Sequence, residues 1–427
     1  MTSPIARSFR LPSGLQLDNR LAKSAMSEAL ADPATGAVSE RLVTLYERLG
    51  RGGFGVLITG NVCLDLEGRT EPGVVVLDRE RDLPMLRRWA EAAQRHGSKL
   101  FMQINHAGRQ VPRRVSGRPV APSAVALEGV GPLFSTPRAL EDEEIRELVR
   151  RWADAADMAR EAGFAGVQIH AAHGYLVSQF LSPKTNRRTD RWGGDLEGRT
   201  RFLLEIVRAI RARVGDGFPI AVKLNSADFQ RGGFTEEESA AVVRALEAEG
   251  IDLLEISGGS YESAAMMGTP DEAPKRESTR RREAYFVDYA ERIRRETKLP
   301  LLLTGGLRTA AAMNEIVEEG HVDLVGLARP VAVAPDVARE LLDGTRDATP
   351  RPSPRLGVRL FDDVLQIAWF QAQLWRMGDG LEPDPRLSRV RALLSAFWHN
   401  YLFNPLTLLA PAPARLLAPP RARRAEV

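Results

Sequence analysis

The sequence predicts an α/β fold in which eight parallel strands close into a barrel and helices surround them. Short apolar runs rich in β-branched residues occur eight times along the chain, and segments with helical periodicity stand between them. A closed (β/α)8 TIM barrel is the simplest arrangement that such an alternation forms. This barrel usually takes about 250 residues. In a chain of 427 residues, the surplus is therefore expected in insertions and at the C-terminus.

The eight predicted strands are apolar enough to be buried on both faces, as strands of a parallel barrel are. They are residues 21–25, 56–59, 100–104, 166–169, 220–224, 253–256, 301–303 and 324–327.

The segments between these runs carry apolar residues at spacings of three and four, which predicts helices with one buried face. One such face comprises Ile145, Leu148, Val149, Trp152, Ala156 and Ala159, and a second comprises Phe202, Ile206, Val207, Ile210 and Val214. A third helix is predicted to begin after Thr235, because Thr235 and Glu238 match a capping box.

Two segments exceed the needs of the barrel. The first lies between His106 and Leu140, is rich in Gly, Pro and Val, and is expected to cap the mouth of the active site. The second follows a proline-rich linker at position 350. We therefore divide the chain into a barrel at 1–349 and a C-terminal helical extension at 350–427.

The extension contains an amphipathic stretch at 360–377, whose aromatic residues are Trp369, Phe370 and Trp375. We expect this stretch to pack on the barrel or on another subunit. If these aromatic side chains are exposed, they form a candidate contact for a homo-oligomer.

Composition excludes several classes of protein. The chain has 44% hydrophobic and 27% charged residues and a formal charge of +3, without a basic stripe, so no nucleic-acid partner is predicted. The single cysteine, Cys63, excludes an intramolecular disulfide and a cysteine-ligated iron–sulfur cluster. The N-terminus lacks an apolar signal core, which favours the cytoplasm. Prolines and polar residues interrupt the apolar segment 401–419, so no membrane span is expected.

The strand that ends near Ile169 is followed by two histidines and a tyrosine: His170, His173 and Tyr175. The C-terminal ends of barrel strands are where catalytic side chains collect. The spacing alone permits packed histidines, a pair that binds a substrate carbonyl, or a metal pair. Zinc generally takes three or more protein ligands, and no third ligand stands at a local spacing, so no metal site is predicted.

The run 168–176, together with 179–183 and 186–194, forms a long block that closely resembles the old yellow enzyme family of FMN-dependent ene-reductases. The resemblance extends over roughly residues 5–345. It implies that His170 and His173 bind the carbonyl oxygen of an α,β-unsaturated substrate and that Tyr175 donates a proton to the α-carbon. Donors fixed at the oxygen would stabilise the negative charge that accumulates there as hydride arrives.

The same resemblance assigns a noncovalent FMN site to scattered strand ends. Residues that lie along or at the edge of the flavin ring are Ser24, Ala25, Met26, Ser27, Gly60, Gln103 and Lys223. Family members carry Cys or Thr at position 27, which tunes the redox potential, and one branch carries a substrate-contacting Tyr where this chain has Ala29. The phosphate is expected on Gly305, Gly306, Ala328 and Arg329, because barrels of this type often bind phosphate after strands seven and eight.

These features predict an NAD(P)H-dependent, FMN-containing oxidoreductase that reduces an activated alkene. A dehydrogenase or demethylase on the same scaffold is an alternative, although its best-known members carry an iron–sulfur cluster. A flavin-binding redox module without turnover is the third reading. The substrate preference depends on the cap around 112–137, on Ala29 and on residues 260–268.

Overall fold

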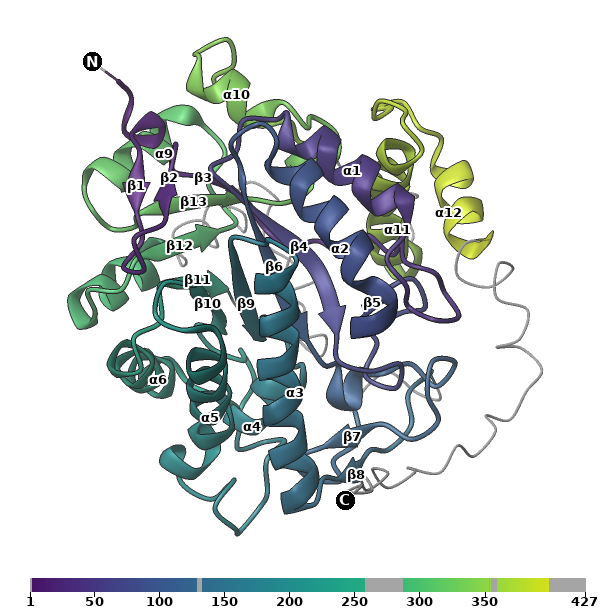
Figure 1. Ribbon diagram of the computed structural model, residues 1–427, viewed down its shortest axis with the longest axis vertical. Helices are drawn as coiled ribbons and strands as arrows, with labels where there is room; N and C mark the ends of the chain where they lie inside the picture. Colours follow the sequence, from purple (N-terminus) through teal and green to yellow (C-terminus); the bar gives the residue numbers. More distant parts are fainter. Residues whose placement is uncertain (1, 129–132, 258–286, 353, 355–358, 399–427) are drawn as a thin grey trace, which may run out of the picture.

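Eight parallel strands hydrogen-bond in a closed ring, with helices on the outside, in a computed structural model of the chain (Figure 1). The structure describes residues 2–128, 133–257, 287–352, 354 and 359–398, and of residues 359–364 the backbone alone. Residues 260–268 and 401–419, which the sequence analysis singled out, lie outside this part. No described helix is both long and apolar enough to cross a bilayer.

The ring confirms all eight predicted strands. In spatial order they are β3 (Leu21–Lys23), β4 (Val56–Cys63), β6 (Lys99–Asn105), β9 (Gly166–Ala171), β10 (Ile220–Asn225), β11 (Leu253–Ser257), β12 (Leu301–Thr304) and β13 (Leu324–Leu327). The pairing of β13 with β3 closes the barrel. Four short strands lie outside the ring: β1 (Phe9–Arg10), β2 (Gln16–Leu17), β7 (Val120–Ala121) and β8 (Arg138–Ala139), and β5 (Val75–Val76) extends the edge of β4.

The outer helices follow the predicted periodicity. They are α1 (Glu40–Gly50), α2 (Arg79–Gln94), α3 (Asp142–Glu161), α4 (Leu176–Leu181), α5 (Leu196–Val214), α6 (Glu236–Ala248), α9 (Ala310–Glu318) and α10 (Val337–Leu342), and residues 287–296 are also helical. Each residue of the predicted α3 face is buried. The capping box of α6 is present: Glu238 N–H donates to Thr235 Oγ1 over 3.2 Å, and Thr235 N–H donates to Glu238 Oε2 over 3.1 Å.

The interior of the barrel changes from apolar to polar along the strands. Toward the N-terminal ends, inward-facing side chains from seven strands form one apolar cluster with two residues of the β1–β2 hairpin: Leu11, Leu17, Ala22, Val56, Ile58, Phe101, Ala221, Leu253, Leu302 and Leu324. One or two positions further along, the inward side chains are Gln103, Gln168, Lys223, Glu255 and Thr304. The barrel is therefore sealed at one end and lined with hydrogen-bonding groups at the other.

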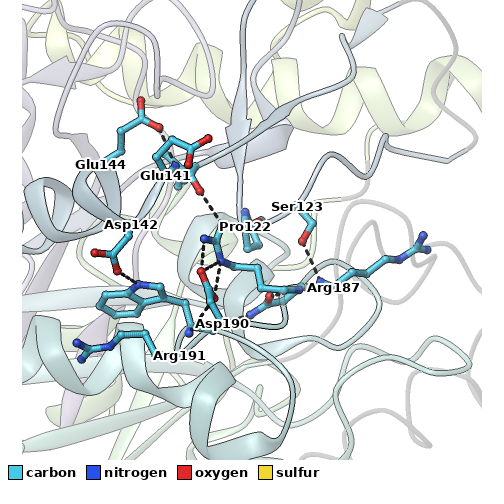
Figure 2. A network of polar contacts seen from close by, with 12 residues as sticks. Pro122, Ser123, Glu141, Asp142, Glu144, Arg187, Asp190 and Arg191 are labelled. Atoms are coloured by element: carbon cyan, nitrogen blue, oxygen red, sulfur yellow. Dashed lines mark hydrogen bonds and ion pairs between the residues drawn. The ribbon is translucent and has the colours of Figure 1, made fainter.

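The insertion after β6 is fastened to the loop that follows α4. The Arg187 backbone N–H donates to Ser123 Oγ over 2.9 Å, as Figure 2 shows. The Arg188 guanidinium donates to the carbonyl oxygens of Pro122 and Leu140, over 3.0 and 2.6 Å. Near its start the insertion forms the short helix η2 (Gly108–Gln110), and its Ala107 and Val111 form a buried apolar cluster with Tyr175. The insertion thus contacts a predicted catalytic residue directly.

The C-terminal extension packs on the barrel of its own chain. Its helix α11 (Arg359–Gly378) lies beside α1, and α12 (Arg389–Phe397) packs on α11 (Figure 1). Trp369, Phe370 and Trp375 are buried. These three side chains therefore do not supply a surface for self-association. Phe397 and Trp398, further along the extension, are about half exposed, and self-association stays a prediction.

Helix α11 also reaches the loops at the open end of the barrel. The Gln371 amide donates to the carboxylate of Glu71 over 3.1 Å, and Glu71 accepts a hydrogen bond from the Ser27 hydroxyl. The Trp375 indole N–H donates to the carbonyl oxygen of Glu28 over 2.8 Å. The extension therefore holds the chain segment that follows β3.

Candidate active site

Three aromatic side chains cluster where β9 ends. The His170 and His173 ring centroids are 5.1 Å apart, and the His170 and Tyr175 ring centroids are 4.9 Å apart, both in edge-to-face geometry. Tyr175 stands directly before α4 and is 4% exposed. The predicted trio is therefore one compact group beside the polar end of the barrel.

The proton of His170 has a defined position. The Ala172 backbone N–H donates to His170 Nδ1 over 3.3 Å, so Nδ1 acts as an acceptor and a neutral ring carries its hydrogen on Nε2. Burial, with smaller contributions from His173 and the positive charge of Lys223, holds the pKa of His170 well below its usual value. At neutral pH, His170 is therefore an uncharged donor through Nε2–H.

His173 is held by contacts on both its backbone and its ring. Its backbone is in the left-handed region, with φ of 62°, which is uncommon for a residue with a side chain. The N–H of His173 donates to Asn225 Oδ1 over 3.2 Å, and its carbonyl oxygen accepts from Gln110 Nε2 over 2.8 Å. Its Nε2 lies 2.7 Å from Ser257 Oγ. These contacts offset the backbone strain and fix the ring beside His170.

Burial is also the main reason that the pKa of His173 lies well below its usual value, and Lys223 contributes. When the Ser257 hydroxyl donates to Nε2, the hydrogen of a neutral His173 sits on Nδ1, which is then the available donor. Each ring can thus present one uncharged N–H group to a ligand.

Below the histidines, a buried network joins several of the predicted flavin-contacting residues. The ammonium of Lys223 is 3.0 Å from Glu255 Oε1, and Thr304 Oγ1 donates to the same oxygen over 2.7 Å. Thr304 Oγ1 is also 2.7 Å from Ser24 Oγ. The side chains of Ser24 and Lys223, predicted separately, therefore meet through two residues that the sequence analysis did not assign.

Gln103 joins this network through a second amide. Gln103 Nε2 donates to Gln168 Oε1, and Gln168 Nε2 donates to Glu255 Oε2, each over 2.7 Å. Lys223 and His170 are register partners on neighbouring strands, so the network and the histidine cluster adjoin. A charged residue inside the apolar run Leu253–Ser257 was the available sequence signal for Glu255.

The glycine at position 60 has a packing reason of its own. A Cβ built there would stand 2.0 Å from Glu28 Oε2, and the Gly60 N–H donates to Glu28 Oε1 over 2.7 Å. Glu28 also accepts from the Tyr46 hydroxyl and lies 3.7 Å from the ammonium of Lys23. The space beside Gly60 is therefore occupied by the Glu28 side chain of the same protein. Contact of Gly60 with a flavin ring stays a prediction.

The Ser27 hydroxyl hydrogen-bonds to another side chain of the protein. Its Oγ donates to the carboxylate of Glu71 over 2.5 Å. Ala25 and Met26, the residues before it, are half-buried, and Ala29 has φ of 51°. The segment that the sequence analysis placed along the flavin is thus shaped by Glu71 and by α11.

The predicted phosphate residues follow β12 and β13. Gly305 and Gly306 have φ of 106° and 85°, and no atom lies within 4 Å of a Cβ built at Gly305. Ala328 precedes the short helix η4 (Arg329–Ala332), and Arg329 Nη1 donates to Gln366 of α11 over 3.3 Å. Open space at Gly305 and an exposed Arg329 guanidinium, which follow the neighbouring strands β12 and β13, are compatible with the predicted phosphate site.

A (β/α)8 barrel whose polar side chains gather at the C-terminal ends of the strands has the architecture of a barrel enzyme. The model of the NADH:flavin oxidoreductase / NADH oxidase family matches residues 10–347. The chain belongs to this family, that of the old yellow enzymes, and is an enzyme that binds FMN and uses NAD(P)H as hydride donor.

Two relatives match most of the chain. The chain is 35% identical over 405 residues to the NADH-dependent flavin oxidoreductase iccE of Talaromyces variabilis, covering 87% of this chain and 97% of that protein. It is 38% identical over 348 residues to iliE of Hypocrea jecorina, covering 76% and 85% of the two chains.

Solved structures share the fold. A 2-naphthoyl-CoA reductase in complex with 2-naphthoyl-CoA superimposes with a TM-score of 0.74 at 29% identity, over 80% of this chain but only 52% of the reductase. The old yellow enzyme homologue from Zymomonas mobilis gives a TM-score of 0.68 at 25% identity, over 81% and 94% of the two chains.

Replacing Arg329 with Ala is expected to weaken FMN binding, because a charged hydrogen bond contributes about 1.5–3 kcal/mol. That corresponds to at least a roughly tenfold higher Kd. Fluorescence titration of the apoprotein with FMN measures this Kd. The matched control is R329K, which keeps the positive charge but cannot make the two parallel hydrogen bonds of a guanidinium. An unchanged Kd in R329A would remove Arg329 from the phosphate site.

Proposed function

We propose that this enzyme reduces activated alkenes such as enones, with His170 and His173 as carbonyl donors and Tyr175 as proton donor. Bound FMN would supply the hydride transfer, in which hydride moves from NAD(P)H through flavin N5 to the β-carbon of the alkene. The observation that supports this most is the compact trio at the end of β9, next to the network of Gln103 and Lys223.

Each member of the trio has a distinct part in this proposal. Two uncharged N–H groups at one oxygen withdraw electron density from the β-carbon and stabilise the oxyanion as it forms. Neutral donors suit the step because the site is buried, where a charged imidazolium would be costly. The phenol of Tyr175, which clusters with Ala107 and Val111 and lies edge-to-face with His170, carries the hydrogen that the α-carbon needs.

The substrate is proposed to be a small molecule with a carbonyl or similar acceptor group conjugated to the double bond. Noncovalent attachment of FMN and a cytoplasmic location stay predictions.

The decisive experiment separates turnover from mere flavin binding. Under anaerobic conditions, NADH or NADPH should bleach the flavin absorbance, and cyclohexenone should restore it with formation of one saturated ketone per flavin. Denaturation should release FMN into solution. Bleaching without recovery by any enone or nitroolefin would contradict alkene reduction and favour a dehydrogenase or a redox module.

A further inference from the structure

Glu255 is a buried carboxylate for which the proposed reaction has no use. It is fully buried in β11, and four polar side chains converge on it directly or through one amide: Lys223, Thr304, Gln168 and, through Gln168, Gln103. Each comes from a different strand of the barrel. Two of them, Gln103 and Lys223, are expected to contact the pyrimidine edge of the flavin.

The carboxylate sets the direction of two amides. Ionised Glu255 can only accept hydrogen bonds, so Gln168 must turn its Nε2 toward it. The oxygen of Gln168 then faces Gln103, which in turn must present its own Nε2. This leaves Gln103 Oε1, an acceptor, and one further hydrogen of Nε2 for a ligand. Without the carboxylate, the amides of Gln168 and Gln103 could both flip and exchange their donor and acceptor atoms. Glu255 thus fixes the orientation of both amides.

Glu255 also offsets the charge of Lys223. The ammonium and the carboxylate are 3.0 Å apart, and both side chains are almost wholly buried, so water screens the pair little. A lysine without this partner would favour the anionic reduced form of the flavin over the neutral oxidised form. With the partner, the cofactor meets a nearly neutral pair.

We propose that Glu255 is a positioning residue of the flavin site that fixes the polarity of the Gln103 amide and neutralises Lys223. The inference rests on the proposed function for the placement of the flavin edge beside Gln103 and Lys223. It makes Glu255 a determinant of the flavin reduction potential, acting through other side chains.

The test is the midpoint potential and the FMN affinity of E255Q, which keeps the size of the side chain and removes its charge. The ratio of oxidised to reduced FMN Kd should rise about tenfold, which is about +30 mV for a two-electron couple. The Kd of oxidised FMN should also rise several-fold, because a neutral amide permits both orientations of Gln168. D252N is the matched control.

Asp252 suits that purpose because it is also a buried carboxylate paired with an arginine, Arg211 at 2.9 Å, but it stands at the N-terminal end of the same strand. Its replacement should leave the potential unchanged. K223M should shift the ratio in the direction opposite to E255Q, and K223M/E255Q should return it close to the wild-type value. A role in packing alone would not produce opposite shifts that cancel.

A wild-type potential and affinity in E255Q would overturn the inference. If E255Q does not fold, the midpoint potentials of K223M and K223M/E255Q test the inference instead. The double variant is expected to fold, because removing both charges of a buried pair is tolerated better than removing one. Equal potentials in the single K223M variant and the wild type would then overturn it. Failure of an enone to reoxidise the wild-type enzyme would instead contradict the proposed function, and the potentials would still be measurable.

Discussion

Replacing Tyr175 with Phe is expected to slow reoxidation of the reduced enzyme by cyclohexenone by about 10²–10⁴-fold, the usual contribution of a general acid. The ring keeps its edge-to-face geometry with His170 and its place in the cluster with Ala107 and Val111, and only the hydroxyl is lost. Reduction of the enzyme by NADPH requires no proton from Tyr175 and should be nearly unchanged. Stopped-flow spectroscopy of the two half-reactions measures both rates.

A nitroolefin is the internal control for this variant. Its reduced product is a nitronate, which solvent can protonate after release, so its reduction should be slowed much less than that of the enone. Equal slowing of both half-reactions would mean that Tyr175 shapes the pocket. An unchanged enone rate would assign the proton to water or to another residue.

Replacing both His170 and His173 with Ala is expected to abolish the binding of phenolic ligands, whose oxyanion resembles the developing enolate. Loss of one oxyanion donor typically costs 10²–10³-fold in rate, so the double variant should lose at least that much in enone reduction. The titration of the charge-transfer absorbance with a phenol at pH 7 measures the binding. At this pH both imidazoles are neutral in the wild type, because burial lowers the pKa of each.

The matched control replaces each histidine with Asn, which keeps an N–H donor near the same position. H170N/H173N should retain part of the phenol affinity that the alanine variant loses. Unchanged titration in the alanine variant would contradict the oxyanion role. Loss of FMN in that variant, measured by the flavin-to-protein absorbance ratio, would show that the histidines support the structure of the site instead.

The strands could be predicted because a parallel barrel strand is buried on both faces, which leaves an uninterrupted apolar run such as 220–224. The capping box of Thr235 and Glu238 could be predicted because it is local. His170, His173 and Tyr175 come from one short segment, so their proximity also follows from the chain itself.

The role of Glu255 could not be predicted in the same way. Its partners come from other strands, and barrel register alone decides that Lys223 lies opposite it. The reason for Gly60 is equally non-local, since the side chain that fills the space beside it belongs to Glu28. Burial of Trp375 against the carbonyl of Glu28 joins positions 347 residues apart, a distance over which sequence pattern carries no information.

The contacts of α11 also bear on the order in which the protein is made. Gln371 and Trp375 hydrogen-bond to Ser27 and Glu28, which precede them in the chain by 344 and 347 positions. These contacts at the open end of the barrel can therefore form only when nearly the whole chain has been translated. At a synthesis rate of about 5–20 residues per second, helix α11 is made tens of seconds after the segment that follows β3. A nascent chain that has emerged only to residue 349 has its eight strands but lacks Gln371 and Trp375. Full retention of FMN is therefore expected to begin after the extension has left the ribosome.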